Sequence, residues 1–203
     1  MGLEALVAFG AVLAVACAAP GPTIAALVAR VLGRGTAGAA SFCAGLLFSD
    51  IVWLTGAVLG LAVLMETVHP LFVAIKYAGA AYLLYLAWKL WSAPAAPLAA
   101  APAAGEGIRL FFGAIAVGSG NPKTMLFYLA LLPTLLPLER LTVADYFMLV
   151  ATQCVVYGAI LVGYVMLAVR ARRAFASARA MRTVNRVTGT VMAGAAIAVA
   201  TRS

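Results

Sequence analysis

Residues 3–29 read LEALVAFGAVLAVACAAPGPTIAALVA. This stretch is almost wholly apolar, and it is long enough to cross ~30 Å of hydrocarbon as a helix. Near its middle stand Pro20, Gly21 and Pro22, and proline removes a backbone hydrogen bond from a helix interior. Because lipid has no water to replace that bond, an interrupted helix survives only against protein or a wet cavity. The stretch therefore predicts a broken transmembrane helix.

The whole chain has the composition of a membrane protein. Of 203 residues, 66% are hydrophobic and 10% are charged. A soluble domain averages about 45–50% apolar and about 25% charged residues. The net charge of +8 would also suit a nucleic-acid-binding protein. The arginines, however, stand between apolar runs rather than on one polar face, so we expect a lipid bilayer as the partner and no nucleic acid.

The apolar runs predict an all-α membrane protein with about six transmembrane helices. The predicted spans are residues 3–29, 38–65, 70–91, 108–136, 141–169 and 184–201. An Ala/Pro-rich stretch, residues 92–107, is typical of a semi-rigid linker. It separates a first three-helix repeat, residues 1–91, from a second, residues 108–203, and both belong to one transmembrane domain.

A second interruption is predicted in the fourth span, where residues 118–123 read GSGNPK. Asn121 is a favoured N-cap residue and Pro122 suits the first position of a helix. A helix is therefore expected to restart here, as another does at Gly21-Pro22. The N-terminus of such a half-helix offers free N–H groups and the positive end of the helix dipole, which favour a carboxylate.

The two halves correspond after a shift of about 101 residues. That shift places the first interruption onto Pro122. It also brings Asp50, central in the second span, near the polar pair Thr152 and Gln153 in the fifth. Since three spans are an odd number, the second half would enter the membrane in the opposite sense, as in secondary transporters whose interrupted helices mark the substrate site. The alternative is a pair of proline kinks without function.

Asp50 and Lys123 are charged residues near the centres of predicted spans. A charge at such a depth costs ~2.5–3.5 kcal/mol on insertion scales, so it usually marks a pathway or pairs with another charge. In a functional interpretation, Lys123 attracts a substrate carboxylate, while Asp50 receives an amino group or exchanges a proton. In a structural interpretation, the two residues neutralise one another and lock the bundle. Different states of one transporter can accommodate both.

Most basic residues are predicted at one side of the membrane, which the positive-inside rule assigns to the cytoplasm. They are Arg30, Arg34, Lys89, Arg109, Arg170, Arg172, Arg173, Arg179, Arg182 and Arg186. Both termini are then expected outside. No basic residue precedes Arg30, so the first span lacks the charged region of a signal peptide and is expected to be retained.

The cysteines are dispersed, and there is a single histidine. Cys17, Cys43 and Cys154 form no CxxC pair and no Cys/His cluster, so we expect no metal, no cofactor and no enzymatic activity. Gly56 and Gly60 form a GxxxG pattern that predicts close helix packing within the monomer, with a homodimer seam as the second interpretation.

Four motifs are similar to those of a known family. They are Pro20-Gly21-Pro22-Thr23, Gly45-Leu-Leu-Phe-Ser-Asp50, Gly79-Ala-Ala-Tyr82-Leu83 and Asn121-Pro122-Lys123. In this order and spacing, over most of the chain, they resemble the LysE/RhtB family of amino-acid exporters. The resemblance implies proton-driven efflux of amino acids or close derivatives from the bacterial cytoplasm, and hence an antiporter of the inner membrane. For the mechanism, our hypothesis is alternating access, in which the two three-helix halves rock about a site built from the two breaks, Asp50 and Lys123.

The resemblance also implies which positions act. The expected substrate-binding residues are Pro20, Gly21, Pro22, Thr23, Asp50, Asn121, Pro122 and Lys123, with Asp50 also coupling protons. Ser49 departs from the family pattern, which often has glycine just before the aspartate. The alternatives are an exporter of another small solute or a cation and, less favoured, a membrane thiol oxidoreductase, for which the cysteines are too dispersed.

Overall fold

The computed structural model describes residues 1–60 and 106–174, together with scattered residues of 77–92 and 183–197. The predicted third and sixth spans and the linker lie wholly or largely outside the described residues. The Gly79–Leu83 motif does so too. The inverted arrangement of two repeats therefore stays a prediction.

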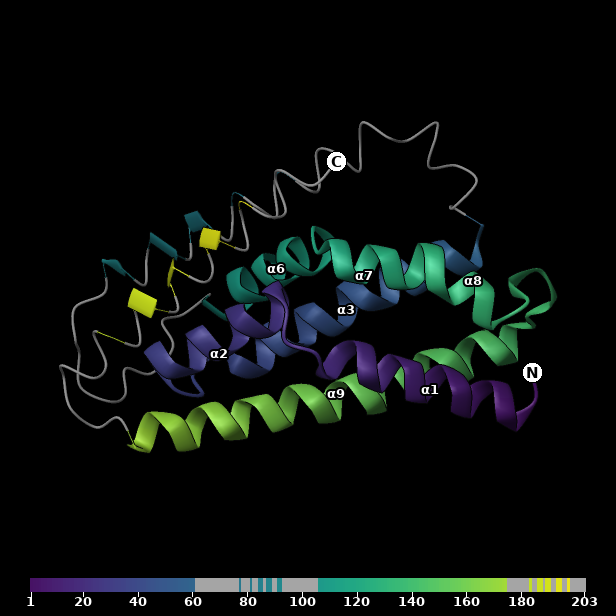
Figure 1. Cartoon of the computed structure of the whole chain (residues 1–203), viewed down its shortest axis with the longest axis horizontal. Helices are drawn as coiled ribbons and strands as arrows, with labels where there is room; N and C mark the ends of the chain where they lie inside the picture. The colour runs from purple at the N-terminus through teal and green to yellow at the C-terminus, as the bar shows by residue number, and fades with distance from the viewer. Residues whose placement is uncertain are drawn as a thin grey trace.

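The first predicted span is a pair of helices, α1 (Leu3–Ala18) and α2 (Pro22–Arg34). Their axes are bent by 56° at the interruption. Gly21 caps α2 with an extended backbone, and Pro22 occupies the first helical turn, where its missing N–H costs nothing. The predicted break and restart are both confirmed (Figure 1).

A tight turn joins α2 to α3 (Ala39–Val58). Gly35 and Gly38 have φ angles of 68° and 70°, a region that only glycine adopts without strain. After α3, Gly60 also has a positive φ, which ends the helix. Residues 61–76, which follow Gly60, lie outside the described part of the chain, so the predicted GxxxG contact stays a prediction.

The second half repeats the pattern of a broken helix followed by a long helix. Its elements are α6 (Glu106–Ser119), α7 (Pro122–Leu126), the π-helical turn η1 (Phe127–Leu131), α8 (Leu132–Leu135), the 3₁₀ turn η2 (Leu138–Arg140) and α9 (Val143–Ala174). The backbone N–H of Lys123 donates to Oδ1 of Asn121 over 3.1 Å, so Asn121 is the predicted N-cap of α7. The second predicted break is also confirmed.

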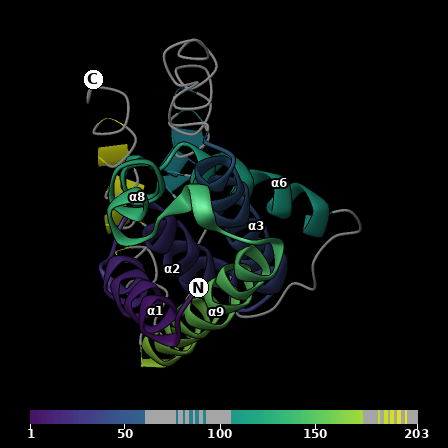
Figure 2. The same cartoon turned by 90° about the vertical axis from the view of Figure 1, so that its right-hand side faces the viewer.

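Within the described part of the chain, α3 and α9 are each long and apolar enough to cross a membrane, and the bent α1–α2 pair makes a third such span. The helices form an elongated bundle in which α9 runs beneath α1, α2 and α3 (Figure 1). In a view along the long axis, α1 and α9 lie on one side and α6 and α8 on the other (Figure 2).

Among the described helices, α3 and α6 approach each other closely. A Cβ added at Gly45 would collide with the Phe111 backbone and would lie 2.8 Å from the Ala114 Cβ. On the other helix, a Cβ at Gly118 would collide with the side chain of Ser49. The serine that departs from the family pattern is therefore accommodated by a glycine on the facing helix.

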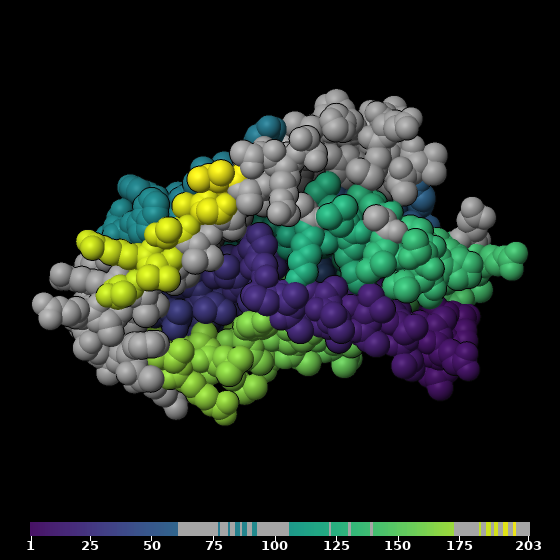
Figure 3. Space-filling model, viewed as in Figure 1, coloured from purple at the N-terminus to yellow at the C-terminus, as the bar shows by residue number. Residues whose placement is uncertain are grey.

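The apolar core is divided into two clusters along the bundle. The arginine-end cluster includes Ile24, Leu27, Phe42, Leu46, Leu110, Ala114, Val117, Tyr157 and Leu161. The N-terminal-end cluster includes Phe9, Leu13, Trp53, Leu54, Phe127, Tyr128, Leu132 and Leu149. On one face of the molecule, side chains of α1 fill the space between α9 and the α7–α8 region (Figure 3).

Basic residues gather at the end where α2 and α9 finish. Glu106, at the start of α6, pairs with Arg34 over 2.9 Å and with Arg30 over 3.5 Å. The Arg172 guanidinium of α9 donates to the carbonyl of Val31 over 3.2 Å. These contacts join α2 to both α6 and α9 at the end that the sequence assigns to the cytoplasm.

Candidate functional site

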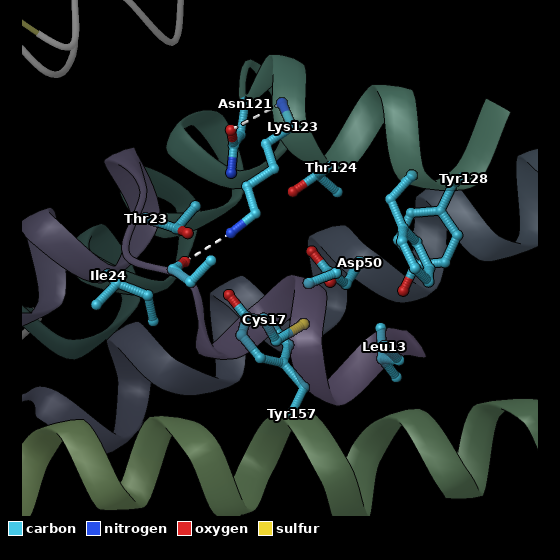
Figure 4. Close-up of a pocket in the computed structure, with 13 residues that line it drawn as sticks. Leu13, Cys17, Thr23, Ile24, Asp50, Asn121, Lys123, Thr124, Tyr128 and Tyr157 are labelled. Carbon is cyan, nitrogen blue, oxygen red and sulfur yellow. Dashed lines mark hydrogen bonds between the residues drawn. The ribbon is translucent and has the colours of Figure 1, made fainter. Parts of the chain in front are cut away.

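The two helix breaks meet at a small cavity between the apolar clusters (Figure 4). It is lined by Leu13, Ala16, Cys17, Ala19, Thr23, Ile24, Asp50, Asn121, Lys123, Thr124, Phe127, Tyr128 and Tyr157. Its volume is about 30 Å³, which is room for roughly two water molecules. The lining thus combines polar side chains, from both breaks and from Asp50 of α3, with apolar and aromatic ones.

Lys123 connects the second break to the first. Its ammonium group donates to the carbonyl oxygen of Ala19, over 2.6 Å, at the C-terminal end of α1. That end of a helix carries exposed carbonyls and a partial negative charge, so a cation is stabilised there. Gly21 lies beside the same side chain, because a Cβ at this position would be 3.6 Å from Cδ of Lys123.

Asp50 projects from the middle of α3 into the cavity (Figure 4). Asp50 is buried, with 4% of its surface exposed. Among the ion pairs of the described residues, none includes Asp50, and Lys123 bonds to a backbone carbonyl instead. In this conformation the two central charges share one cavity without a direct ion pair, so the structural interpretation of a locked pair is not met.

The N-terminus of α2 faces the same cavity. Thr23 and Ile24 line it, and the first helical hydrogen bond at this end is donated by the N–H of Ala25 to Gly21. The N–H groups of Thr23 and Ile24 come before this first helical hydrogen bond, so the helix itself offers them no acceptor. No side chain caps this end of the helix either. Such groups, with the positive end of the dipole, favour an anion.

The predicted site residues play different parts in the structure. Thr23, Asp50, Asn121 and Lys123 all line the cavity. The others are backbone positions of the breaks: Pro20 lies exposed in the first break, Gly21 caps α2, and Pro22 and Pro122 begin the restarted helices. Their part is to shape the two half-helices rather than to line the cavity.

Sequence reasoning did not assign several lining residues to the site. They are Leu13, Cys17, Thr124, Phe127, Tyr128 and Tyr157. Helical spacing offers a signal for some of them, because residues four apart share a face. Thr124 and Tyr128 are spaced in this way after the Asn121 cap, and so are Leu13 and Cys17 before the first break.

Tyr128 lies in the π-helical turn η1, an irregularity that is frequent at functional sites. Tyr128 is 1% exposed, and its hydroxyl has no hydrogen-bond partner among the described residues. The hydroxyl points toward the region between Asp50 and Leu13 (Figure 4). Packing alone would not require a hydroxyl at this place.

The cysteines are all free and half-buried, and only Cys17 lines the cavity. No group of three metal-binding side chains occurs among the residues that the structure describes. Paired thiols, which a thiol oxidoreductase needs, are therefore not brought together in this conformation.

Comparison with known proteins decides the family. The model of the LysE type translocator family matches residues 14–203. The chain belongs to this family. It is therefore a multi-pass membrane translocator and not an enzyme, as the sequence predicted, and the resemblance seen in the motifs is confirmed.

The chain is similar to bacterial efflux proteins. It is 32% identical to a homoserine/homoserine lactone efflux protein of Salmonella typhi over 164 residues, which cover 79% of this chain and 78% of the relative. It is also 32% identical to a leucine efflux protein of Salmonella choleraesuis over 115 residues, covering 55% and 53%. No solved structure matches the chain.

Proposed function

We propose that this translocator exports amino acids or close derivatives, with their uncharged side chains facing an apolar wall. The proposal rests on one observation: two opposite charges line the same cavity but do not bond to each other. Lys123 and Asp50 both line the cavity, and Lys123 is held by a backbone carbonyl. A zwitterion, with one carboxylate and one ammonium group, is complementary to this arrangement.

The carboxylate of the substrate would bind at the breaks. Lys123 supplies a cation there, and the uncapped N–H groups of Thr23 and Ile24 supply donors. Charge-assisted hydrogen bonds of this kind are about twice as strong as neutral ones. The carboxylate would replace the Ala19 carbonyl as the partner of Lys123, which would free the end of α1 to move.

The ammonium group of the substrate would bind Asp50. Because Asp50 is buried, an uncompensated charge there is costly, and a bound ammonium or a proton relieves that cost. Among the described lining residues, Asp50 is the sole carboxylate. The site therefore favours neutral over cationic amino acids, since a second ammonium would lack a partner.

Transport would proceed by alternating access. The cavity of about 30 Å³ is far smaller than a typical ligand pocket of roughly 300–1,000 Å³, so it must widen to admit an amino acid. We infer that two inverted three-helix repeats rock about the two breaks, with both termini outside. Asp50 would take up a proton from outside as the empty carrier resets, which makes the protein an antiporter. A homodimer is a further prediction.

The relatives name the first substrates to test, homoserine, its lactone and leucine. Purified protein is reconstituted in liposomes that are preloaded with these compounds and a panel of amino acids, and their loss is followed under a pH gradient. We expect gradient-dependent efflux of one or a few neutral amino acids, reduced at least about tenfold by Lys123→Ala. Arg140→Ala, an exposed cation outside the cavity, is the matched control.

The same experiment separates the alternatives. Efflux that matches empty liposomes, despite correct insertion of the protein, would contradict the amino-acid proposal. The search for a substrate would then turn to other small solutes and to cations. For a cation, Asp50 would be the central ligand.

A further inference from the structure

The proline that begins α2 leaves a backbone carbonyl of α1 without its usual donor. In an α-helix the carbonyl of one residue accepts from the N–H four residues later. Pro22 stands four residues after Ala18, and proline has no N–H, so the carbonyl of Ala18 lacks this donor. The last helical hydrogen bond at this end of α1 is donated by the N–H of Ala19 to Val15, over 3.2 Å. The carbonyls beyond it need donors from outside the helix.

Two side chains from the second half of the chain donate to this end of α1. The hydroxyl of Tyr164, on α9, donates to the carbonyl of Ala18 over 2.7 Å. The ammonium group of Lys123 donates to the next carbonyl, that of Ala19, over 2.6 Å (Figure 4). Because lipid offers no water to such carbonyls, leaving one of them unpaired is costly. The geometry of the first break therefore depends on both donors.

Packing holds the ring of Tyr164 in place. Tyr164 is half-buried and packs against the arginine-end cluster. Tyr157, seven residues earlier, shares its face of α9 and lines the cavity, as does Thr23 at the start of α2. Both parts of the first broken span, α1 and α2, pack against α9. The hydroxyl of Tyr164 thus reaches the break from a packed helix face.

The two donors differ in what else they can bind. Lys123 lines the cavity and carries a charge, so a substrate carboxylate can draw it away from Ala19. Tyr164 is not among the residues that line the cavity. Its bond to Ala18 can therefore persist while Lys123 changes its partner.

We propose that Tyr164 is a positioning residue for transport. Its hydroxyl holds the carbonyl of Ala18, so that Lys123 has a single backbone carbonyl to leave when substrate binds. The proposal rests on the function proposed above, in which the substrate carboxylate takes over Lys123. An ammonium group has three N–H donors. Without the hydroxyl, Lys123 would bond to Ala18 as well as to Ala19, and the substrate would have to displace both carbonyls.

Tyr164→Phe tests this role, because it removes the hydroxyl and keeps the ring. The full-length protein is reconstituted in liposomes, and initial efflux is measured over a range of internal substrate concentrations. The probe is whichever of homoserine, leucine and the amino-acid panel the wild type exports fastest. We expect the half-saturating concentration to rise at least about fivefold and the maximum rate to stay within about twofold. Substrate binding is weakened, whereas the steps after Lys123 has left Ala19 are not.

Tyr146→Phe is the matched control. Tyr146 is also on α9, and its hydroxyl shares a hydrogen bond of 2.8 Å with Thr55 of α3. Neither of these two residues lines the cavity. The control removes an interhelical bond of the same kind from the same helix, so we expect its half-saturating concentration to equal that of the wild type. Tyr164→Leu repeats the loss of the hydroxyl should Tyr164→Phe fail to insert.

The outcomes are distinct. An unchanged half-saturating concentration, a loss of maximum rate alone, or an equal rise in Tyr146→Phe overturns the positioning role and leaves the proposed function standing. Export of no amino acid by the wild type defeats the proposed function, and the role of Tyr164 falls with it.

Discussion

At the scale of single residues, the site depends on where two charges find their partners. Lys123 is satisfied by the Ala19 carbonyl, at the end of the first half-helix, and Asp50 is left facing the cavity. If the two residues were bonded to each other, a substrate would have to separate an ion pair before binding. The observed contact instead leaves the carboxylate available for a substrate ammonium or a proton.

The role of Asp50 is tested by Asp50→Asn. The amide keeps the size of the side chain but neither carries a charge nor exchanges a proton at neutral pH. We expect gradient-driven efflux to fall at least about tenfold, measured in liposomes with correctly inserted protein. Glu4→Gln, an exposed carboxylate in the first turn of α1, is the control. Wild-type efflux by Asp50→Asn would show that Asp50 does not couple protons.

The residue scale is also where sequence reasoning was least complete. Asp50, Asn121 and Lys123 stand out because a charge or an N-cap residue is rare inside an apolar run. Tyr128 does not stand out, since an aromatic residue in a helical bundle usually packs. What marks it is the π-helical turn and an unpaired hydroxyl, and both depend on packing between segments far apart in the chain.

At the scale of elements, the broken helices were predictable because their signals are local. Proline, glycine and an Asn-Pro pair determine backbone geometry within a few residues. The α3–α6 contact was not predictable, because it depends on which glycine faces which side chain. Gly45 and Gly118 make this close approach, and neither stands in a sequence pattern that indicates it.

The α3–α6 contact gives a prediction about stability. In Gly118→Ala, the new methyl group would collide with Ser49, and overpacking of this kind costs about 1–3 kcal/mol. We expect a lower melting temperature of the purified protein in detergent. Ser49→Gly in the same molecule removes the obstacle and should restore most of the loss. A double variant as unstable as Gly118→Ala would contradict the close packing of these two residues.

At the scale of the whole molecule, the described helices hold two apolar clusters, and the cavity with its polar side chains lies between them. The composition and the apolar runs predicted a membrane protein, and the family match confirms it. The cavity itself could be predicted only in part. Asp50 and the two breaks were expected at similar depth, but the place of Tyr157 in the cavity wall depends on the packing of α9 against the other helices.

We propose that the exported amino acid binds in the cavity between the two breaks, and the accessibility of Cys17 can show whether it does. Cys17 lines the cavity, whereas Cys43 is half-buried on α3 and does not line it. Variants that keep one of these two cysteines and replace the others by serine are treated with a maleimide, with and without saturating substrate. We expect substrate to slow the modification of Cys17 and to leave that of Cys43 unchanged. An amino acid that is exported but does not protect Cys17 would contradict it.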